Sequence, residues 1–154
     1  MTSLTTAPTV QTGHVGLNVS DITRSKQFYQ QVFGFEVLGE SQEVGRQFVF
    51  LAQDGTLVLT LWQQSEGRFA THQPGLHHLA FQVSSIEVVR AFEERLQALD
   101  TPFLYDGVVP HGEGADSGGV YFEDPDGIRL EIYSPSGAGG FAAATVDAPS
   151  CGFF

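Results

Sequence analysis

The chain has 154 residues, 42% of them apolar, and a formal net charge of −11. It has the length of one ordinary domain and enough apolar residues to form a core. Its negative charge argues against binding to nucleic acid or to an anionic membrane surface. A single cysteine, Cys151, excludes an intrachain disulfide. Because neither a signal peptide nor a membrane-spanning run is visible, the sequence predicts a cytoplasmic protein.

The sequence contains an internal repeat with an offset of 64 residues, from His14 to His78. HVGLNVSDITRSKQFY aligns with HLAFQVSSIEVVRAFE, and Phe28 falls on Phe92. Each copy opens with apolar residues at every second position, which indicates a strand. Apolar residues at helical spacing follow, which indicates a helix.

The first copy is predicted to fold as a strand, a helix and three further strands. The helix begins at the cap residue Ser20 or Asp21 and ends at Gly34. The four strands cover residues 14–19, 35–41, 46–52 and 56–63.

The second copy is predicted to follow the same order. Its helix begins at Ser84 or Ser85 and carries an apolar stripe. An Asp-Gly pair precedes the last strand of each copy, at Asp54-Gly55 and Asp126-Gly127, as expected of hairpin turns. The three strands after the helix cover residues 102–109, 118–123 and 128–133.

These elements predict an α+β fold built from two βαβββ modules. A flexible N-terminus is expected before the domain, and a mobile tail rich in Gly and Ala after it. The tail ends in CGFF, whose aromatic residues could dock into a cleft, although loose packing is the simpler expectation. The N-terminus is 1–11, the domain 12–135, its modules 12–63 and 76–135, their connector 64–75 and the tail 136–154.

Three residues are candidate ligands of a divalent metal ion. His14 and His78 hold equivalent positions at the first strand of each copy, on the face opposite its aliphatic residues. Glu131 lies in the last strand of the second copy, where Leu130 and Ile132 face the other way. An ionised carboxylate buried in a sheet is costly unless it is paired or binds a metal. Two imidazoles and one carboxylate suit Fe(II) or Mn(II), and Zn(II) is also compatible.

The segments HVGLNVSDITRSKQFYQQVFGF, GLHHLAFQV and YFEDPDGIRLEIYSP together resemble the vicinal oxygen chelate superfamily. It includes glyoxalases, bleomycin-resistance proteins, fosfomycin-resistance enzymes, methylmalonyl-CoA epimerases and extradiol dioxygenases. The resemblance covers about residues 12–135. It implies that the two modules curl a mixed sheet around a metal cleft. It also implies ligands on the first and last strands of the modules, here His14, His78 and Glu131.

The resemblance implies one more ligand position, on the last strand of the first copy. Aligning the two Asp-Gly turns places Leu59 there, and residues 56–63 contain no acid. Glyoxalase I and the epimerases normally place Glu or Gln at this position, and Gln63 would serve only in a shifted register. His77 is the weaker ligand candidate beside His78, because strand alternation would turn it to the opposite face.

Two histidines and one carboxylate resemble instead the Fe(II) ligands of extradiol dioxygenases, which act on catechol-like substrates. In that resemblance Tyr121, ten positions before Glu131, donates a hydrogen bond near the substrate. The alternative is that Tyr121 is a strand aromatic residue that packs in the core. His111, in the loop PHGEGADSGG, is a candidate acid or base, or else a solvent-facing loop residue. The resemblance thus implies a metal-dependent dioxygenase with a small-molecule substrate. Fe(II) is favoured as the cofactor, with Mn(II), Zn(II) or Ni(II) as alternatives.

Two other functional classes remain open. One is a glyoxalase-type lyase or isomerase, or a thiol transferase, each active without oxygen. Fosfomycin-modifying enzymes also use two histidines and one glutamate, but they carry basic residues beyond the glutamate, and no Lys or Arg follows Glu131 here. The other class is a metal-free, drug-binding resistance protein, which often lacks all three ligands.

Further aromatic and basic residues have two interpretations each. Trp62, Phe48 and Phe50 are expected in the core, with the lining of a cleft as the alternative. Arg129 is expected to stay solvated, with contact to an anionic substrate group as the alternative. The stretch GEGADSGG is a candidate flexible lid.

The resemblance also implies a homodimer. In small relatives the two modules pair either within one chain or across a swapped dimer. In a swapped dimer, His14 would come from one chain, and His78 with Glu131 from the other.

Overall fold

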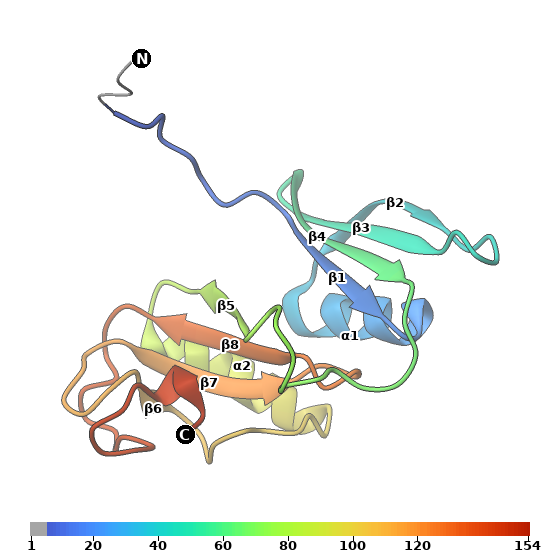
Figure 1. Cartoon of the computed structure of the whole chain (residues 1–154). Coiled ribbons are helices and arrows are strands. Elements are labelled where there is room, and N and C mark those ends of the chain that lie inside the picture. Colours follow the sequence, from blue (N-terminus) through green and yellow to red (C-terminus); the bar gives the residue numbers. More distant parts are fainter. Residues whose placement is uncertain (1–5) are drawn as a thin grey trace.

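The computed structural model describes residues 6–154 and contains two four-stranded sheets, one in each module (Figure 1). The first module consists of β1 (Val15–Val19), α1 (Ile22–Phe33), β2 (Glu36–Ser41), β3 (Phe48–Gln53) and β4 (Thr56–Gln63). Its strand order is β1-β4-β3-β2, with β1 parallel to β4. The predicted flexible N-terminus includes residues 1–5, which lie outside the described residues.

The second module repeats this arrangement. It consists of β5 (Leu79–Gln82), α2 (Ile86–Ala98), β6 (Val109–Pro110), β7 (Gly118–Glu123) and β8 (Arg129–Ser134). Its strand order is β5-β8-β7-β6, with β5 parallel to β8. The predicted α+β fold with two βαβββ modules is therefore confirmed. A short 3₁₀ helix, Ser150–Gly152, follows in the tail.

Both helices begin at predicted cap residues. Asp21 Oδ1 accepts a hydrogen bond from the Arg24 N–H at 3.0 Å, and Ser85 Oγ accepts one from the Val88 N–H at 3.3 Å. These bonds satisfy N–H groups that have no partner within the helix. Gly34 ends α1 with a φ of 70°, a left-handed conformation that only glycine adopts readily.

One predicted strand is wrong. Within residues 102–109 only the last residue belongs to a strand, β6, apart from one isolated bridge at Phe103. Pro102 has no N–H to donate to a ladder, and Gly107 turns the chain with a φ of 73°. The segment therefore runs along the edge of β7 as an irregular loop.

Each helix packs on one face of its own sheet, and the modules meet through aromatic residues (Figure 1). Leu130 and Ile132 of β8 are fully buried in the core, as strand alternation predicted. Phe33 at the end of α1 packs on Phe81 of β5, with ring centroids 4.5 Å apart. The face of each sheet away from its helix, called the open face below, is thus left for other contacts.

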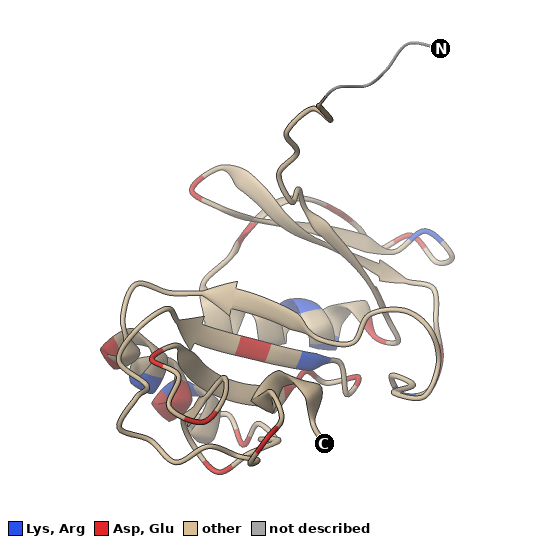
Figure 2. Ribbon diagram, turned by 60° about the vertical axis from the view of Figure 1, so that its left-hand side comes forward, with Lys and Arg blue, Asp and Glu red and all other residues tan. Residues whose placement is uncertain are grey.

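The charged residues lie mainly outside the sheets. Figure 2 shows Asp and Glu spread over the helices and turns, with few charged residues on the strands. Only seven Lys and Arg residues accompany 18 acidic ones, so the negative charge covers much of the surface. Within residues 6–154, no helix combines the length and apolar character needed to cross a membrane.

The DPDG turn between β7 and β8 is held by a buried carboxylate, Asp124. It accepts a hydrogen bond from the Tyr29 hydroxyl of α1 at 2.8 Å. It also accepts bonds from the N–H groups of Asp126 and Ile128, each at 2.9 Å. Asp124 is 3% exposed, so it both closes the turn and ties the second module to the first helix.

Asp126 makes a second connection between the modules. Its Oδ2 accepts a hydrogen bond from the Ser20 N–H at 3.0 Å, and its Oδ1 pairs with the Arg24 guanidinium at 3.0 Å. Ser20 and Arg24 flank the start of α1. The turn that leads into β8 is therefore fixed against the first module.

We expect Asp124→Asn to flatten the pH dependence of stability. Burial raises the pKa of Asp124 from 3.8 to about 6. Between these values the folded protein binds a proton that the unfolded chain has released. The stability that this group contributes is therefore fully present below pH 3.8 and is lost as the pH rises through about 6. The free energy of unfolding lost in this way is about 3 kcal/mol. Asn does not ionise and so avoids the loss, while its carbonyl oxygen can still accept hydrogen bonds from the Asp126 and Ile128 N–H groups.

Urea unfolding at pH values from about 3 to about 7 measures this effect. The free energy of unfolding of Asp124→Asn, relative to the natural protein, should rise by about 3 kcal/mol over that range. Asp54→Asn, in an exposed turn, is the control. A difference between the two proteins that does not change with pH would contradict the prediction.

Candidate functional site

Glu131 lies on the open face of the second sheet. In the register of β8 it stands between Ala80 of β5 and Tyr121 of β7. It is only 2% exposed, although α2 packs on the opposite face of this sheet. Other side chains must therefore cover the carboxylate and compensate its loss of hydration.

Two imidazole rings contact the Glu131 carboxylate. His78 Nε2 lies 3.5 Å from Oε2, and His111 Nε2 is within hydrogen-bond reach of Oε1. Ser117 Oγ lies 2.8 Å from His111 Nδ1 and orients that ring. Burial lowers the pKa of His78, and the Glu131 carboxylate raises it by a smaller amount. The net lowering favours the neutral imidazole, which is the form that binds metals. His111 therefore lies at the site and not free in solvent.

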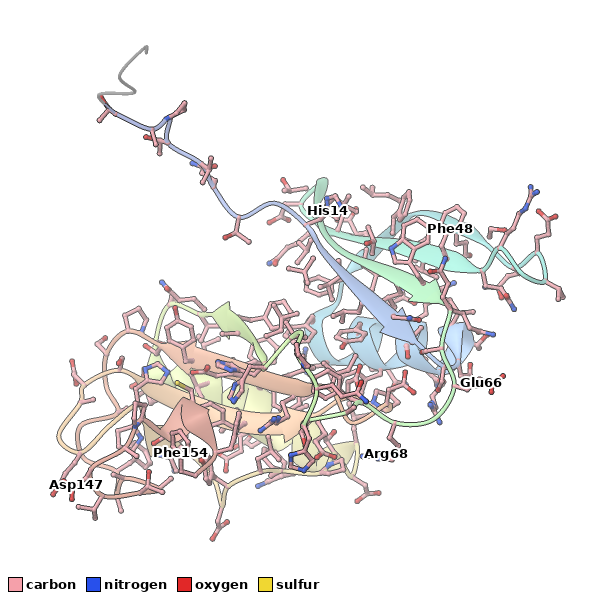
Figure 3. The ribbon with its side chains drawn as sticks, in the orientation of Figure 1. His14, Phe48, Glu66, Arg68, Asp147 and Phe154 are labelled. Carbon is pink, nitrogen blue, oxygen red and sulfur yellow. The ribbon has the colours of Figure 1, made fainter. Side chains whose placement is uncertain are left out.

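One chain assembles only two of the three predicted metal ligands. His14 precedes β1 and is exposed on the first module, whereas Phe154 of the tail lies beside the second module (Figure 3). Among residues 6–154, no group of three or more His, Cys, Asp or Glu residues is arranged to hold a metal ion. His78 and Glu131 are together, and His14 is not with them.

The position of the first sheet that corresponds to Glu131 is Thr60, and the prediction of Leu59 is wrong. Gly16 pairs with Thr60 in β1 and β4 as Ala80 pairs with Glu131 in β5 and β8. The register between β3 and β4 shifts by one residue just after the Asp-Gly turn. Such a bulge inserts one extra residue in a strand, which moves every later side chain by one position.

Neither Thr60 nor Gln63 is free to act as a further metal ligand. Thr60 is 3% exposed, and its Oγ1 accepts a hydrogen bond from Trp62 Nε1 at 3.0 Å. Gln63 Oε1 accepts a hydrogen bond from the Ile22 N–H at 2.8 Å, at the start of α1. The last strand of the first module therefore supplies no carboxylate and no available amide.

Two buried polar groups at the second sheet have no hydrogen-bond partner within residues 6–154. They are the Tyr121 hydroxyl and Arg129 Nε. Burial, and then the Glu131 carboxylate, raises the pKa of Tyr121, so the phenol keeps its proton. Unpaired buried polar atoms are rare because each costs free energy, and they call for an explanation such as a role in binding.

An aromatic cluster of Phe48, Phe50 and Trp62 occupies the open face of the first sheet (Figure 3 labels Phe48). The Phe48 ring centroid lies 4.8 Å from that of Phe50 and 5.6 Å from that of Trp62. All three residues are partly exposed, and none belongs to the buried core. The prediction of core positions is therefore wrong, and the alternative of a cleft lining fits their location.

The tail packs on the second module, although the sequence predicted a mobile segment. Ala138 and Ser150 are fully buried. The Phe153 ring centroid lies 5.9 Å from that of His78 and 5.5 Å from that of Tyr121. The end of the chain thus covers part of the candidate site.

Three further residues lie at this face, and the sequence analysis assigned no role at the site to Tyr105. His77 stacks on Phe153 at 5.6 Å, because it precedes β5, where strand alternation does not apply. The expectation that His77 faces away is therefore wrong. Tyr105 stacks on Phe153 at 5.9 Å and comes from the irregular segment before β6. Only the unusual CGFF ending pointed to Phe153.

The donor chemistry fits a divalent transition metal. Two ligands bonded to one ion at about 2.1 Å lie about 3 to 3.5 Å apart, depending on the angle. His78 Nε2 and Glu131 Oε2 lie 3.5 Å apart. A neutral imidazole and a carboxylate suit iron, manganese or zinc. These two residues can therefore form one side of a metal site.

A model of the Glyoxalase/Bleomycin resistance protein/Dioxygenase superfamily matches residues 11–132. The chain belongs to this superfamily. A catechol-2,3-dioxygenase of Bacillus subtilis (strain 168) is 28% identical over 126 residues, or 79% of this chain and 40% of that protein. The chain thus spans about two fifths of that relative. A metallothiol transferase FosB of Staphylococcus saprophyticus is 30% identical over 126 residues, or 79% of this chain and 74% of that protein.

A solved structure extends the similarity to the superfamily. A glyoxylase/bleomycin resistance protein/dioxygenase domain from Frankia sp. EAN1pec aligns with a TM-score of 0.70 and 25% identity. The alignment covers 82% of this chain and 98% of that one. Other relatives are named as metal-dependent enzymes and include both dioxygenases and thiol transferases. Members of the superfamily thus share one fold but catalyse several kinds of metal-dependent reaction.

Proposed function

We propose that this protein is a metal-dependent dioxygenase of the extradiol type, acting on a small catechol-like substrate. The observation that carries the proposal is the donor set. His78 and Glu131 lie together on the second sheet, and Thr60 stands where the first sheet would carry another ligand. Histidines with a single carboxylate leave several coordination positions open, as a chelating substrate and dioxygen require.

The second part of the proposal is a homodimer in which His14 of one copy joins His78 and Glu131 of another. Within residues 6–154, His14 has no hydrogen-bond partner, and it is exposed beside the open face of the first sheet. That face also carries the partly exposed aromatic cluster. Exposed aromatic residues grouped on one face favour burial against a second surface. A second copy that presents its second sheet there would bury the cluster and complete the ligand set.

His78, Glu131 and His14 of the second copy would hold the ion, with Fe(II) favoured and Mn(II), Zn(II) or Ni(II) as alternatives. When bound, such an ion supplies a Lewis-acid centre, and Fe(II) or Mn(II) can also exchange electrons with dioxygen.

The remaining side chains act on the substrate and its protons. The Tyr121 hydroxyl, which has no partner of its own among the described residues, donates a hydrogen bond to a substrate oxygen as negative charge develops there. His111 Nε2 accepts or returns a proton, and Ser117 holds the ring in place through Nδ1. Tyr105 and His77 line the approach with aromatic surface and exclude water, which suits a planar ring.

Oxygen uptake tests the reaction. Protein loaded anaerobically with Fe(II), Mn(II) or Zn(II) is mixed with a panel of catechols in an oxygen electrode. We expect one oxygen molecule to be consumed for each catechol lost, with Fe(II) or Mn(II) but not with Zn(II), because zinc has no redox chemistry.

Absence of oxygen uptake with every catechol and metal would contradict the proposal. Turnover of a glutathione hemithioacetal under nitrogen would then favour a lyase of the glyoxalase type. Protein purified without chelators that contains no metal, and takes up none, would favour a drug-binding protein instead.

A further inference from the structure

The end of the tail is anchored to the second module through Ser150. Its hydroxyl donates to the Pro110 carbonyl at 2.6 Å, and its N–H donates to the His111 carbonyl at 2.9 Å. The Tyr105 hydroxyl donates to the Ser150 carbonyl at 2.6 Å. Ser150 is fully buried, so the chain is fixed at this point. The chain after this anchor places Phe153 over the second sheet.

Beyond the anchor, the Phe153 ring is surrounded by side chains on several sides. The Tyr105 and His77 rings lie nearly parallel to it, with interplanar angles of 17° and 29°. The Tyr121 and His78 rings meet it edge to face, at 88° and 84°. The Arg129 guanidinium carbon lies over the ring, 4.7 Å from its centroid. These five residues, called the ring cage below, enclose one six-membered aromatic ring.

The ring cage is imperfectly matched to phenylalanine. Arg129 Nε and the Tyr121 hydroxyl are buried beside the ring and have no hydrogen-bond partner among the residues that the structure describes. A phenyl ring has no acceptor for either group. A ring that carried oxygen substituents would pair with both, and a carboxylate suits arginine best.

The backbone around Phe153 also indicates that its ring can be displaced from the ring cage. Phe153 has a φ of 56°, in the left-handed region that large side chains rarely adopt. Phe154, which follows it, is 84% exposed. The ring can therefore leave its place by rotation after the Ser150 anchor, with no change to either sheet.

We propose that the ring cage is a subsite for an aromatic ring with an anionic substituent, and that Phe153 occupies it until such a ligand displaces it. The tail then acts as a tethered competitor of the ligand. Arg129 pairs with the anionic substituent, and Tyr121 donates to a ring oxygen. That the ligand is also a substrate rests on the proposed dioxygenase function; the subsite itself does not.

Benzoate binding tests the subsite without any reaction. Isothermal titration calorimetry compares benzoate with its neutral analogue benzamide, for the natural protein, Phe153→Ala and the control Phe154→Ala. If the cage is open in about 1 to 10% of molecules, removing the tethered ring should tighten benzoate binding about 10- to 100-fold. Phe154→Ala should bind benzoate as the natural protein does, because its ring is exposed. In the Phe153→Ala background, Arg129→Gln should remove the preference for benzoate over benzamide.

Two results would overturn the inference. Benzoate binding that is unchanged or weaker in Phe153→Ala shows that the tail does not compete for the subsite. A preference for benzoate that survives Arg129→Gln assigns the anion to another group.

Oxygen uptake with 3,4-dihydroxybenzoate separates this inference from the proposed function. Tighter benzoate binding without any oxygen uptake supports the subsite and contradicts the dioxygenase.

Discussion

Mixing two inactive variants, His14→Ala and His78→Ala, is expected to restore metal binding and oxygen uptake to about one quarter of the natural level. In a swapped dimer, each site takes His14 from one chain and His78 with Glu131 from the other. A dimer of one variant with the other has one site that retains all three ligands. Random reassociation makes about half of the dimers mixed, with one intact site of two in each.

The control mixes His78→Ala with Glu131→Gln. Both substitutions lie in the same half of the site, so every site in every dimer lacks a ligand and no activity should return. Mass spectrometry under native conditions confirms that mixed dimers form. Mixed dimers of His14→Ala and His78→Ala without recovery would exclude a site shared between chains. Full metal occupancy in His14→Ala alone would show that His14 is not a ligand.

Glu131→Gln is expected to lower the metal content to background while the protein stays folded. Groups that merely support a metal ligand change affinity about 10- to 100-fold, so loss of the carboxylate ligand itself should exceed that range. The amide keeps the size of the side chain and a carbonyl oxygen that can accept a hydrogen bond from His111. Elemental analysis measures the metal, and circular dichroism measures the fold.

Glu123→Gln is the matched control for this substitution. Glu123 ends β7 and pairs with Arg68 at 3.2 Å on the surface, away from the Glu131 carboxylate. The metal content of Glu123→Gln should equal that of the natural protein. Equal metal content in Glu131→Gln and Glu123→Gln would show that Glu131 is not a ligand.

Local patterns predicted most of the fold. The alternation of Leu130, Glu131 and Ile132 placed the carboxylate on the face away from the helix, since neighbouring residues of a strand face opposite ways. The helix caps at Asp21 and Ser85 followed from side chains that satisfy free N–H groups. These features depend on residues only a few positions apart, so a single sequence is enough to find them.

Features that depend on distant contacts were not predictable in the same way. The bulge that puts Thr60 opposite Gly16 arises between two paired strands, and no residue type marks it. The contact of His111 with Glu131 depends on the path of a loop, and the burial of Phe153 depends on the anchor at Ser150. The repeat identified His14 as equivalent to His78, but equivalence within a duplicated unit does not place two side chains in one site.

The hydrogen bonds of the DPDG turn have a consequence for dissecting the molecule. Although the chain looks like a tandem duplication, its halves are not interchangeable building blocks. A fragment that began at residue 76 would leave Asp124 without the Tyr29 hydroxyl and Asp126 without Arg24 and the Ser20 N–H. It would also expose the apolar side of Phe81 to water. Cooperative unfolding should therefore encompass both halves at once, and neither should be recoverable as a well-folded piece.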